Sequence, residues 1–527
     1  MRRTILSIAV LVIASSALAL PIVTVDSKAP LLKIKVMIRA GSAQDPEGLE
    51  GLAALTGMLL RDGGFGDPAH PVTKEKLADL TRAWGSAAYP TTQVTKEVTV
   101  VHFSVPRELA GQYIDQVLGP MLTRPLFDAA ELARVRGETL QELRSGLRLE
   151  RIEDFGLTAL DNLIHEGTAY AHWDGGTEKG LEKADRAAVL SFYKTYYRPE
   201  NIVVGISSTD KALIKKVETA LAAFEHTDAE PLPVREQKAA PLVSGRSALI
   251  IELPNAISSG IHAGYPIGLS RKDKDFWPLY VGNVWLGTHR DDFSHLYHVI
   301  REERGYNYGD YSYIEHFEGR PENLFPPFNT PRRFQYFSLW ARPVAHQYVP
   351  HIMRALTWEL QRFVDTGLDE EQCRMAKNKA KILYLSLAET TDRILASRLD
   401  DAFYGMEPGY LPGYLSRVEK SSCEQINTAV KKYLSSQNLK FLVVTKKGEA
   451  AKIEAGIASK DPVWGKEPQD YNIDAKEEDG RKVYEVPQSK LDILRRDAVW
   501  AFAPLDIPKS AVRVVPAEKM FVTSALP

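Results

Sequence analysis

Residues 41–58 read GSAQDPEGLEGLAALTGM, a glycine-rich polar loop that runs directly into an apolar, helix-like segment. A strand-like run precedes the loop at Leu31–Arg39, and the helix-like run covers Leu52–Leu60. Apolar residues then alternate over Val94–Val105, as in a strand with one buried face. This order of strand, loop, helix and strand predicts an α+β unit in which helices cover a sheet.

The same order returns in the second part of the chain. The segments are two strand-like runs at Ser247–Leu253 and Gly260–Ile267, a helix-like Phe276–Trp285 and an alternating strand at Phe334–Arg342. Two landmarks match in both parts. The helix-starting turns at Asp128 and Asp369 lie 241 residues apart, and Asn201 and Asn438, which precede strands, lie 237 apart. Nearly equal offsets indicate two copies of one unit.

We therefore expect an α+β fold with two homologous α/β-sandwich domains, at residues 25–235 and 242–458. The charged, proline-rich segment Asp228–Pro241 is the expected linker. Residues 459–527 form a C-terminal extension, expected to pack on the second domain as strands or an arm. Two ordinary α+β domains that resemble each other by chance are the alternative.

The composition excludes several classes of protein. The 527 residues carry 66 Lys and Arg against 68 Asp and Glu, with both signs interspersed, so no basic field gathers nucleic acid or anionic lipid. Cys373 and Cys423 lie fifty residues apart in helix-like stretches. This spacing favours two isolated buried thiols over a metal site or a disulfide framework, and one bridge between them is the alternative.

Residues 1–20 have the pattern of a secretory signal peptide. Arg2 and Arg3 precede an apolar run from Ile5 to Leu20, and the small residues Ala17 and Ala19 mark a cleavage site near Ala19. The run is short for a membrane span, so we expect an exported protein without stable membrane insertion, periplasmic in a bacterium with two membranes. A retained N-terminal anchor is the alternative.

The loop and helix at 41–58 resemble those of the insulinase, pitrilysin and mitochondrial processing peptidase family. The metal-binding helix of these zinc peptidases carries the inverted motif H-x-x-E-H directly after Gly-Leu-Ala. Here the three motif positions hold Ala54, Gly57 and Met58. Alanine and glycine donate no ligand, and a methionine thioether suits copper(I) rather than zinc. The sequence therefore predicts no metal and no cofactor in this chain.

Other candidate ligands do not restore a zinc site. The resemblance implies a third ligand, a distal glutamate, in the helix that contains Glu138 and Glu142, but without the histidines it has no site to complete. Two histidine pairs remain, His295 with His298 and His346 with His351. Neither has an acidic base at ligand spacing, so we expect them at the surface or satisfied in the core.

Residues 294–308, SHLYHVIREERGYNY, resemble the second signature of the family. There a helix ends in Arg-Glu, turns at a glycine and enters a strand through a tyrosine seven residues after the arginine. Arg301 and Tyr308 have that spacing. The resemblance implies that they are catalytic: the arginine fork binds a substrate carbonyl or carboxylate, and the phenol stabilises an oxyanion in the zinc site of a partner. A salt bridge and a core tyrosine are the alternative.

Two domains correspond to half of the clam-shell chamber of the family. The resemblance thus implies a zinc-free subunit of an exported heterodimeric metallopeptidase that degrades or processes peptides. Its partner would be a homologous H-x-x-E-H subunit that holds the zinc, and Arg301 and Tyr308 would act in the partner's site on a peptide substrate. Pairing of the chain with itself stays open.

The alternative function is a catalytically inactive scaffold or peptide-binding protein of the same fold. A scaffold has no chemical reason to keep Arg301 and Tyr308, which makes this pair the discriminating feature. An autonomous enzyme of another class is disfavoured, because the sequence contains no G-x-S-x-G, P-loop or dinucleotide-binding glycine pattern.

Overall fold

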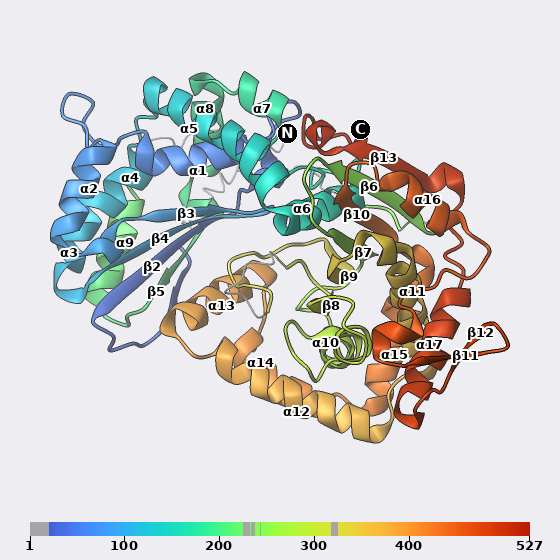
Figure 1. Ribbon diagram of the computed structural model, residues 1–527. Coiled ribbons are helices and arrows are strands. Elements are labelled where there is room, and N and C mark those ends of the chain that lie inside the picture. The colour runs from blue at the N-terminus through green and yellow to red at the C-terminus, as the bar shows by residue number, and fades with distance from the viewer. Residues whose placement is uncertain (1–19, 225–231, 233–237, 243, 318–324) are drawn as a thin grey trace, which may run out of the picture.

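The computed structural model describes residues 20–224, 232, 238–242, 244–317 and 325–527 (Figure 1). Residues 1–19 of the predicted signal peptide and most of the predicted linker 228–241 lie outside this part of the chain. Two mixed sheets with covering helices dominate the structure, which confirms the α+β class (Figure 1). In the described part of the chain, no helix combines the length and apolar character needed to cross a bilayer.

The first sheet has the strand order β1-β5-β2-β4-β3. Its strands are β1 (Ile22–Thr24), β2 (Leu31–Ile38), β3 (Thr91–Val94), β4 (Thr99–Pro106) and β5 (Ile202–Ile206). The central β2 runs antiparallel to β4 and β5, with Ile34 opposite Phe103 and Val36 opposite Val204. The edge strand β1 pairs with β5 in parallel.

The second sheet has the order β13-β6-β10-β7-β9-β8. Its strands are β6 (Ser247–Leu253), β7 (Ser259–Ile267), β8 (Gly309–Tyr313), β9 (Gln335–Val344), β10 (Lys440–Lys446) and β13 (Val512–Pro516). Without β13, the order and directions repeat those of the first sheet: β6 and β10 form the parallel pair, as β1 and β5 do. The repeat seen in the sequence is thus also a repeat of topology.

Helices follow the strands in the same sequence in both halves. The first half contains α1 (Leu52–Asp62), α2 (Lys74–Ala83), α3 (Ala110–Tyr113), α4 (Gly119–Thr123), α5 (Ala129–Gln141), α6 (Ile152–Ile164), α7 (Glu178–Lys183), α8 (Arg186–Tyr196) and α9 (Lys211–Leu221). The second contains α10 (Phe276–Gly287), α11 (Val349–Thr366), α12 (Glu370–Leu387), α13 (Thr391–Tyr404), α14 (Tyr410–Lys420), α15 (Cys423–Tyr433), α16 (Ala450–Ala458) and α17 (Gln488–Phe502).

The matched aspartates of the sequence are helix caps. The Asp128 carboxylate accepts hydrogen bonds from the backbone N–H groups of Ala130 and Glu131, at 2.8 and 3.0 Å, and starts α5. Asp369 accepts from the N–H of Gln372 at 2.8 Å and starts α12. An aspartate satisfies helix N–H groups that have no intrahelical partner, which explains why both turns keep this residue.

The two halves exchange one helix each. Helix α6 belongs in sequence to the first half but packs on β7 and β10 of the second sheet, with Leu160 and Ile164 in the same core as Leu442. Helix α13 belongs to the second half but packs on β5, β1 and β2 of the first sheet (Figure 1). A Cβ on Gly205 of β5 would lie only 3.1 Å from Leu395 of α13. Because glycine has no side chain, α13 can approach the sheet closely at this position. Each sheet therefore completes its core with a helix from the other half.

The prediction of a single strand over Val94–Val105 is wrong in detail. The chain makes a hairpin there, since β3 ends at Val94 and β4 begins at Thr99. Thr95 closes the turn by donating its N–H to the carbonyl of Val98 at 2.9 Å. Two short antiparallel strands produce nearly the same alternation of apolar residues as one long strand.

The C-terminal residues contact both halves. Strand β13 pairs in parallel with β6 at the edge of the second sheet, and α17 packs against α11. Beyond β13, the carbonyls of Phe521 and Val522 accept the N–H groups of Glu178 and Lys179 in the first half. The extension thus joins the second sheet to α7.

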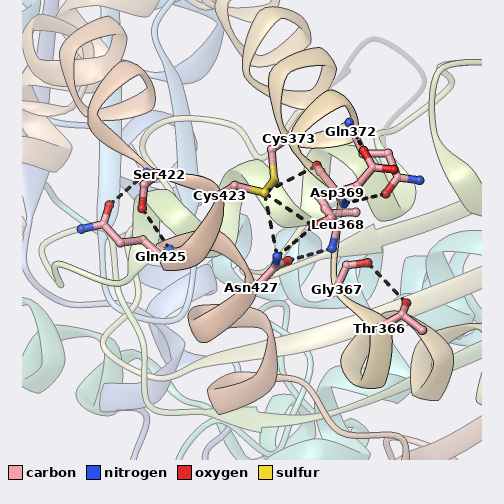
Figure 2. The surroundings of a disulfide bond; sticks show 10 residues. All are labelled: Thr366, Gly367, Leu368, Asp369, Gln372, Cys373, Ser422, Cys423, Gln425 and Asn427. Atoms are coloured by element: carbon pink, nitrogen blue, oxygen red, sulfur yellow. Dashed lines mark hydrogen bonds between the residues drawn. A yellow bond between two sulfur atoms is a disulfide. The ribbon is translucent and has the colours of Figure 1, made fainter.

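The prediction of two isolated thiols is wrong, because Cys373 and Cys423 form a disulfide with a Cα–Cα distance of 5.6 Å (Figure 2). Helix α14 packs against α12, so the chain runs back toward the start of α12. Cys423, the first residue of α15, therefore lies beside Cys373 in the first turn of α12. Asn427 holds the adjoining turn through two hydrogen bonds with the Leu368 backbone, at 2.8 and 2.9 Å. A separation of fifty residues in sequence concealed this proximity.

Replacing both cysteines by alanine should lower the free energy of unfolding by about 2–4 kcal/mol, because the crosslink restricts the unfolded chain. Urea unfolding of the oxidised protein and of the double variant measures the difference. Reductant should lower the stability of the native sequence and leave that of the variant unchanged. Equal stability of the oxidised native protein and the double variant would contradict the assignment of a stabilising disulfide.

Candidate functional site

A cavity of about 840 Å³ lies between the two halves of the chain. The motif positions Ala54 and Met58 line it from α1, and His316, Phe328 and Arg332 line it from the second half. Glu138 and Glu142 face the same cavity. Helix α1, which resembles in sequence the metal-binding helix of zinc peptidases, thus presents Ala54 and Met58 to this cavity.

The third motif position, Gly57, faces strand β3 rather than open space. A Cβ built on Gly57 would lie 2.9 Å from Cγ2 of Val94 and 3.1 Å from Cγ2 of Thr92. Interiors packed at this density admit no added side chain without displacement of a neighbour. The place that a general-base glutamate would need is filled by two residues of β3.

The loop before α1 keeps its shape through one buried carboxylate. Asp45 accepts hydrogen bonds from the N–H groups of Gly51 and Ala53, at 2.6 and 2.7 Å, and contacts His172 Nε2 at 3.3 Å. Burial raises the pKa of the Asp45 carboxyl. Gly51 has φ of 112°, a conformation that favours glycine. The glycine-rich loop is therefore stabilised by its own contacts and does not depend on a metal.

The two glutamates of the cavity are engaged in ion pairs. Glu138 accepts from Arg134 at 2.7 Å, and Glu142 pairs with Arg151. Glu142 begins the π-helical segment η5 (Glu142–Glu150) that continues α5. Within the residues that the structure describes, no group of three His, Cys, Asp or Glu side chains is arranged to hold a metal ion. The donor set at Ala54, Gly57 and Met58 does not fit catalytic zinc.

A buried network of charges closes the floor of the cavity. Arg332 donates two parallel hydrogen bonds to Asp161, at 2.8 and 3.1 Å, and Lys96 lies 2.9 Å from Asp174 and 3.8 Å from Asp161. Burial opposes ionisation of Asp161, but the neighbouring Arg332 and Lys96 outweigh it and hold the pKa of Asp161 far below its usual range. Burial lowers the pKa of His316 to about 3, so this ring is neutral.

This network joins three distant parts of the chain: the β3–β4 turn, α6 and the segment before β9. Sequence reasoning missed it because nothing in the sequence marks Lys96, Asp161 or Arg332 as partners. The adjacent charges Lys96 and Glu97 interrupt the strand-like run Val94–Val105, and this interruption could have pointed to a turn with buried charges.

Arg301 and Tyr308 lie together, but outside the large cavity. Arg301 is on the π-helical segment η7 (Tyr297–Glu302), and Tyr308 precedes β8 with 72% of its surface exposed. Both line a separate pocket of about 370 Å³. The two cavities flank the first turn of α6, where Glu153 lines the pocket and Asp154 the cavity. The chain therefore does not bring Arg301 and Tyr308 to its own Ala54 and Met58.

The remaining histidine candidates have other partners. His295 hydrogen-bonds the buried Glu359 at 2.7 Å, and His298 contacts Glu302 at 2.9 Å. In the other pair, His346 hydrogen-bonds the Ser259 hydroxyl and His351 the Val463 carbonyl, both at 2.9 Å. Each of the four rings thus has a hydrogen-bond partner at one nitrogen or more.

Comparison with known proteins gives a consistent result. A family model described as peptidase M16 inactive domain matches residues 183–380. An uncharacterized zinc protease of Streptomyces coelicolor is 30% identical over 141 residues, which cover 25% of this chain. The chain spans only 29% of the length of that relative.

Two solved structures share the fold. One is the peptidase M16 inactive domain from Pseudomonas fluorescens, with a TM-score of 0.66 and 19% identity over 81% of this chain and 95% of that chain. The other is a protease from Helicobacter pylori, with a TM-score of 0.67 and 12% identity over 80% and 96%. At these identities the two structures establish the fold alone.

The packing around Gly57 predicts that Gly57→Glu lowers the free energy of unfolding by about 1–3 kcal/mol, because the side chain collides with β3. Met58→His is the matched control on the same helix, and it should cost less than Gly57→Glu, because Met58 lines the cavity and its position already accommodates a side chain. Urea unfolding measures both. Equal effects of the two substitutions would show that position 57 is not blocked.

The buried charge network predicts a large effect of Arg332→Met, about 3–5 kcal/mol in unfolding free energy, because Asp161 is left buried without its main partner. The double variant Arg332→Met with Asp161→Leu should recover part of that loss. The exposed pair Arg82 and Asp79 serves as the control, and Arg82→Met should cost at most about 1 kcal/mol. If Arg332→Met costs no more than Arg82→Met, the network contributes nothing to stability.

Proposed function

We propose that the chain is the zinc-free subunit of an exported heterodimeric metallopeptidase, and the match of residues 183–380 to the peptidase M16 inactive domain supports this proposal. A homologous partner with an intact H-x-x-E-H motif would hold the zinc, and the complex would degrade or process peptides. The observation that carries the proposal is the contrast between the two signatures. The Cβ position of Gly57 is crowded by β3, whereas Tyr308 is exposed and the half-buried Arg301 lines the same pocket.

Arg301 and Tyr308 would bind and orient the peptide in the partner's site. The guanidinium presents several N–H donors in a fixed plane, which suits a carbonyl or carboxylate oxygen. The phenol donates a single hydrogen bond and can stabilise negative charge that develops on a carbonyl oxygen. The exposure of Tyr308 supports a role toward a second molecule, because core packing would have buried a tyrosine in this position.

Strand β3 offers a route for an extended peptide into the cavity. It is the last strand in the order of the first sheet, and Thr91, Gln93 and Val94 line the cavity. The outer backbone of an edge strand can pair with an added strand. An unfolded peptide could therefore lie along β3 and across the blank face of α1.

Export is supported by two features of the chain. The first is the signal-peptide pattern of residues 1–20. The second is the disulfide between Cys373 and Cys423, because disulfides persist in oxidising compartments such as the periplasm. The two features are independent, since one belongs to the N-terminal sequence and the other to the folded second half.

A second candidate function is a catalytically inactive peptide-binding or scaffold protein of the same fold. The separation of the Arg301 pocket from the large cavity favours this candidate, because a peptide held against Met58 would not reach Arg301 within one chain. Activity of a mixture with the cognate zinc subunit distinguishes the two functions.

Purified alone, the chain should hold no stoichiometric zinc and cleave no peptide. Mixed with its cognate H-x-x-E-H subunit, it should restore peptide hydrolysis, and Tyr308→Phe should then lower kcat by about 10²–10³ without loss of assembly. Tyr484→Phe is the matched control, because Tyr484 lies on the β11–β12 hairpin (Ala475–Glu478 and Arg481–Tyr484), donates its hydroxyl to Gln469 and lines neither cavity.

Peptide hydrolysis and metal analysis of the separate and mixed proteins measure these effects, and size-exclusion chromatography reports assembly. One tightly bound zinc per chain would end the proposal. A complex that assembles and keeps the same kcat after the Tyr308→Phe substitution would assign the pair to structure and favour the scaffold.

A further inference from the structure

The pocket that contains Arg301 has an unusual concentration of cations. Its charged and aromatic lining consists of Arg290, Arg301, Arg342, Tyr297, Tyr308 and Tyr311, together with a single acid, Glu153. Three guanidinium groups therefore face one carboxylate. The volume of about 370 Å³ admits part of a peptide but no folded domain.

Arg301 is held by aromatic rings rather than by acids. Its guanidinium lies 4.4 Å from the ring centroid of Tyr297 and 5.9 Å from that of Tyr308. Among the described residues, its side chain has no hydrogen-bond or ion-pair partner. Contact with the face of a ring leaves the N–H groups at the edge of the guanidinium plane available to a ligand.

A buried acid lies beside this arginine. Asp310, at the start of β8, is fully buried, and burial raises the pKa of its carboxyl well above the usual value. One of its oxygens accepts a hydrogen bond from Asn307 at 2.6 Å, which fixes the turn that carries Tyr308. Arginine side chains stay protonated in proteins, so Arg301 contributes a positive charge to the pocket.

The floor of the pocket is rigid. Arg342, on β9, pairs with Glu153 of α6 and lies 5.8 Å from the ring centroid of Tyr311. Gly309 permits this arrangement, because a Cβ there would collide with the Tyr311 hydroxyl. Since the charge of Glu153 is balanced by Arg342, the lining has an excess of positive charge around Arg301.

We propose that this pocket binds a carboxylate group of the peptide substrate, either the carboxylate at a peptide C-terminus or the side chain of an aspartate or glutamate. The carboxylate would accept two parallel hydrogen bonds from Arg301, a third from Tyr308, and lie in the field of Arg342. The inference rests on the proposed function for the identity of the ligand as a peptide. It adds the substrate class, peptides that present an acidic end or acidic residue.

Three fluorescein-labelled peptides of one otherwise uncharged sequence test the proposal with the purified chain alone. The first ends in a free carboxylate, the second in an amide, and the third in an amide with aspartate as its last residue. Fluorescence anisotropy gives each Kd. The free-acid peptide should bind about tenfold or more tightly than the plain amide, as expected for a charge-assisted, bidentate contact.

Variants of the chain locate the effect. Arg301→Gln should abolish the preference for the carboxylate, and Arg301→Lys should retain part of it, because lysine keeps the charge but not the fork. Arg82→Gln, which removes an exposed arginine on α2, is the matched control and should change no Kd. Thermal unfolding of each variant verifies that the fold is intact.

Tight binding of the first peptide alone assigns the pocket to chain termini, and tight binding of the first and third assigns it to carboxylates in general. Equal Kd values for all three peptides, or a preference that survives Arg301→Gln, would overturn the inference. The assay contains no zinc subunit. A carboxylate preference without restored hydrolysis in the mixture would therefore refute the proposed function and leave this inference standing.

Discussion

The bidentate contact between Arg332 and Asp161 is the constraint on which the rest of the molecule depends. Asp161 lies on α6, a helix of the first half that covers the second sheet, and Arg332 precedes β9 of that sheet. Lys96 of the β3–β4 turn completes the charge balance. Because buried ions are stable only when paired, the network fixes the relative position of the two halves and hence the cavity between them.

The blank metal position and the cation pocket are two independent products of that arrangement. Ala54 and Met58 line the cavity, whereas a Cβ on Gly57 would crowd Val94 and Thr92, so a larger residue at position 57 would require β3 to shift. The Arg301 pocket lies on the other side of the first turn of α6 from the cavity, and there Arg301 contacts the rings of Tyr297 and Tyr308. The proposed role of this pair is thus toward a ligand or partner outside the cavity.

Much of the fold could be predicted from the sequence, because periodicity and caps are local properties. The Asp128 and Asp369 turns start α5 and α12, and the strand-like run Ser247–Leu253 forms β6. The residue types at 54, 57 and 58 are likewise read directly from the sequence, and Ala54, Gly57 and Met58 offer no nitrogen or oxygen ligand of the kind that zinc prefers. These features need no knowledge of distant contacts.

What could not be predicted depends on contacts across the chain. The exchange of α6 and α13 leaves no local signal, because both helices are amphipathic in the ordinary way and either sheet could bury them. To predict the disulfide, one would have to know the path of α14. To predict where Arg301 lies relative to Met58, one would have to know that α6 crosses to the second sheet.

The exchange of helices has a consequence for biosynthesis. The first sheet cannot finish its core until α13, which ends at Tyr404, has left the ribosome, and the second sheet acquires its last strand only at Pro516. The core of the first sheet is therefore incomplete while the N-terminal half alone has emerged. The order of synthesis delays the completion of both cores until most of the C-terminal half is present.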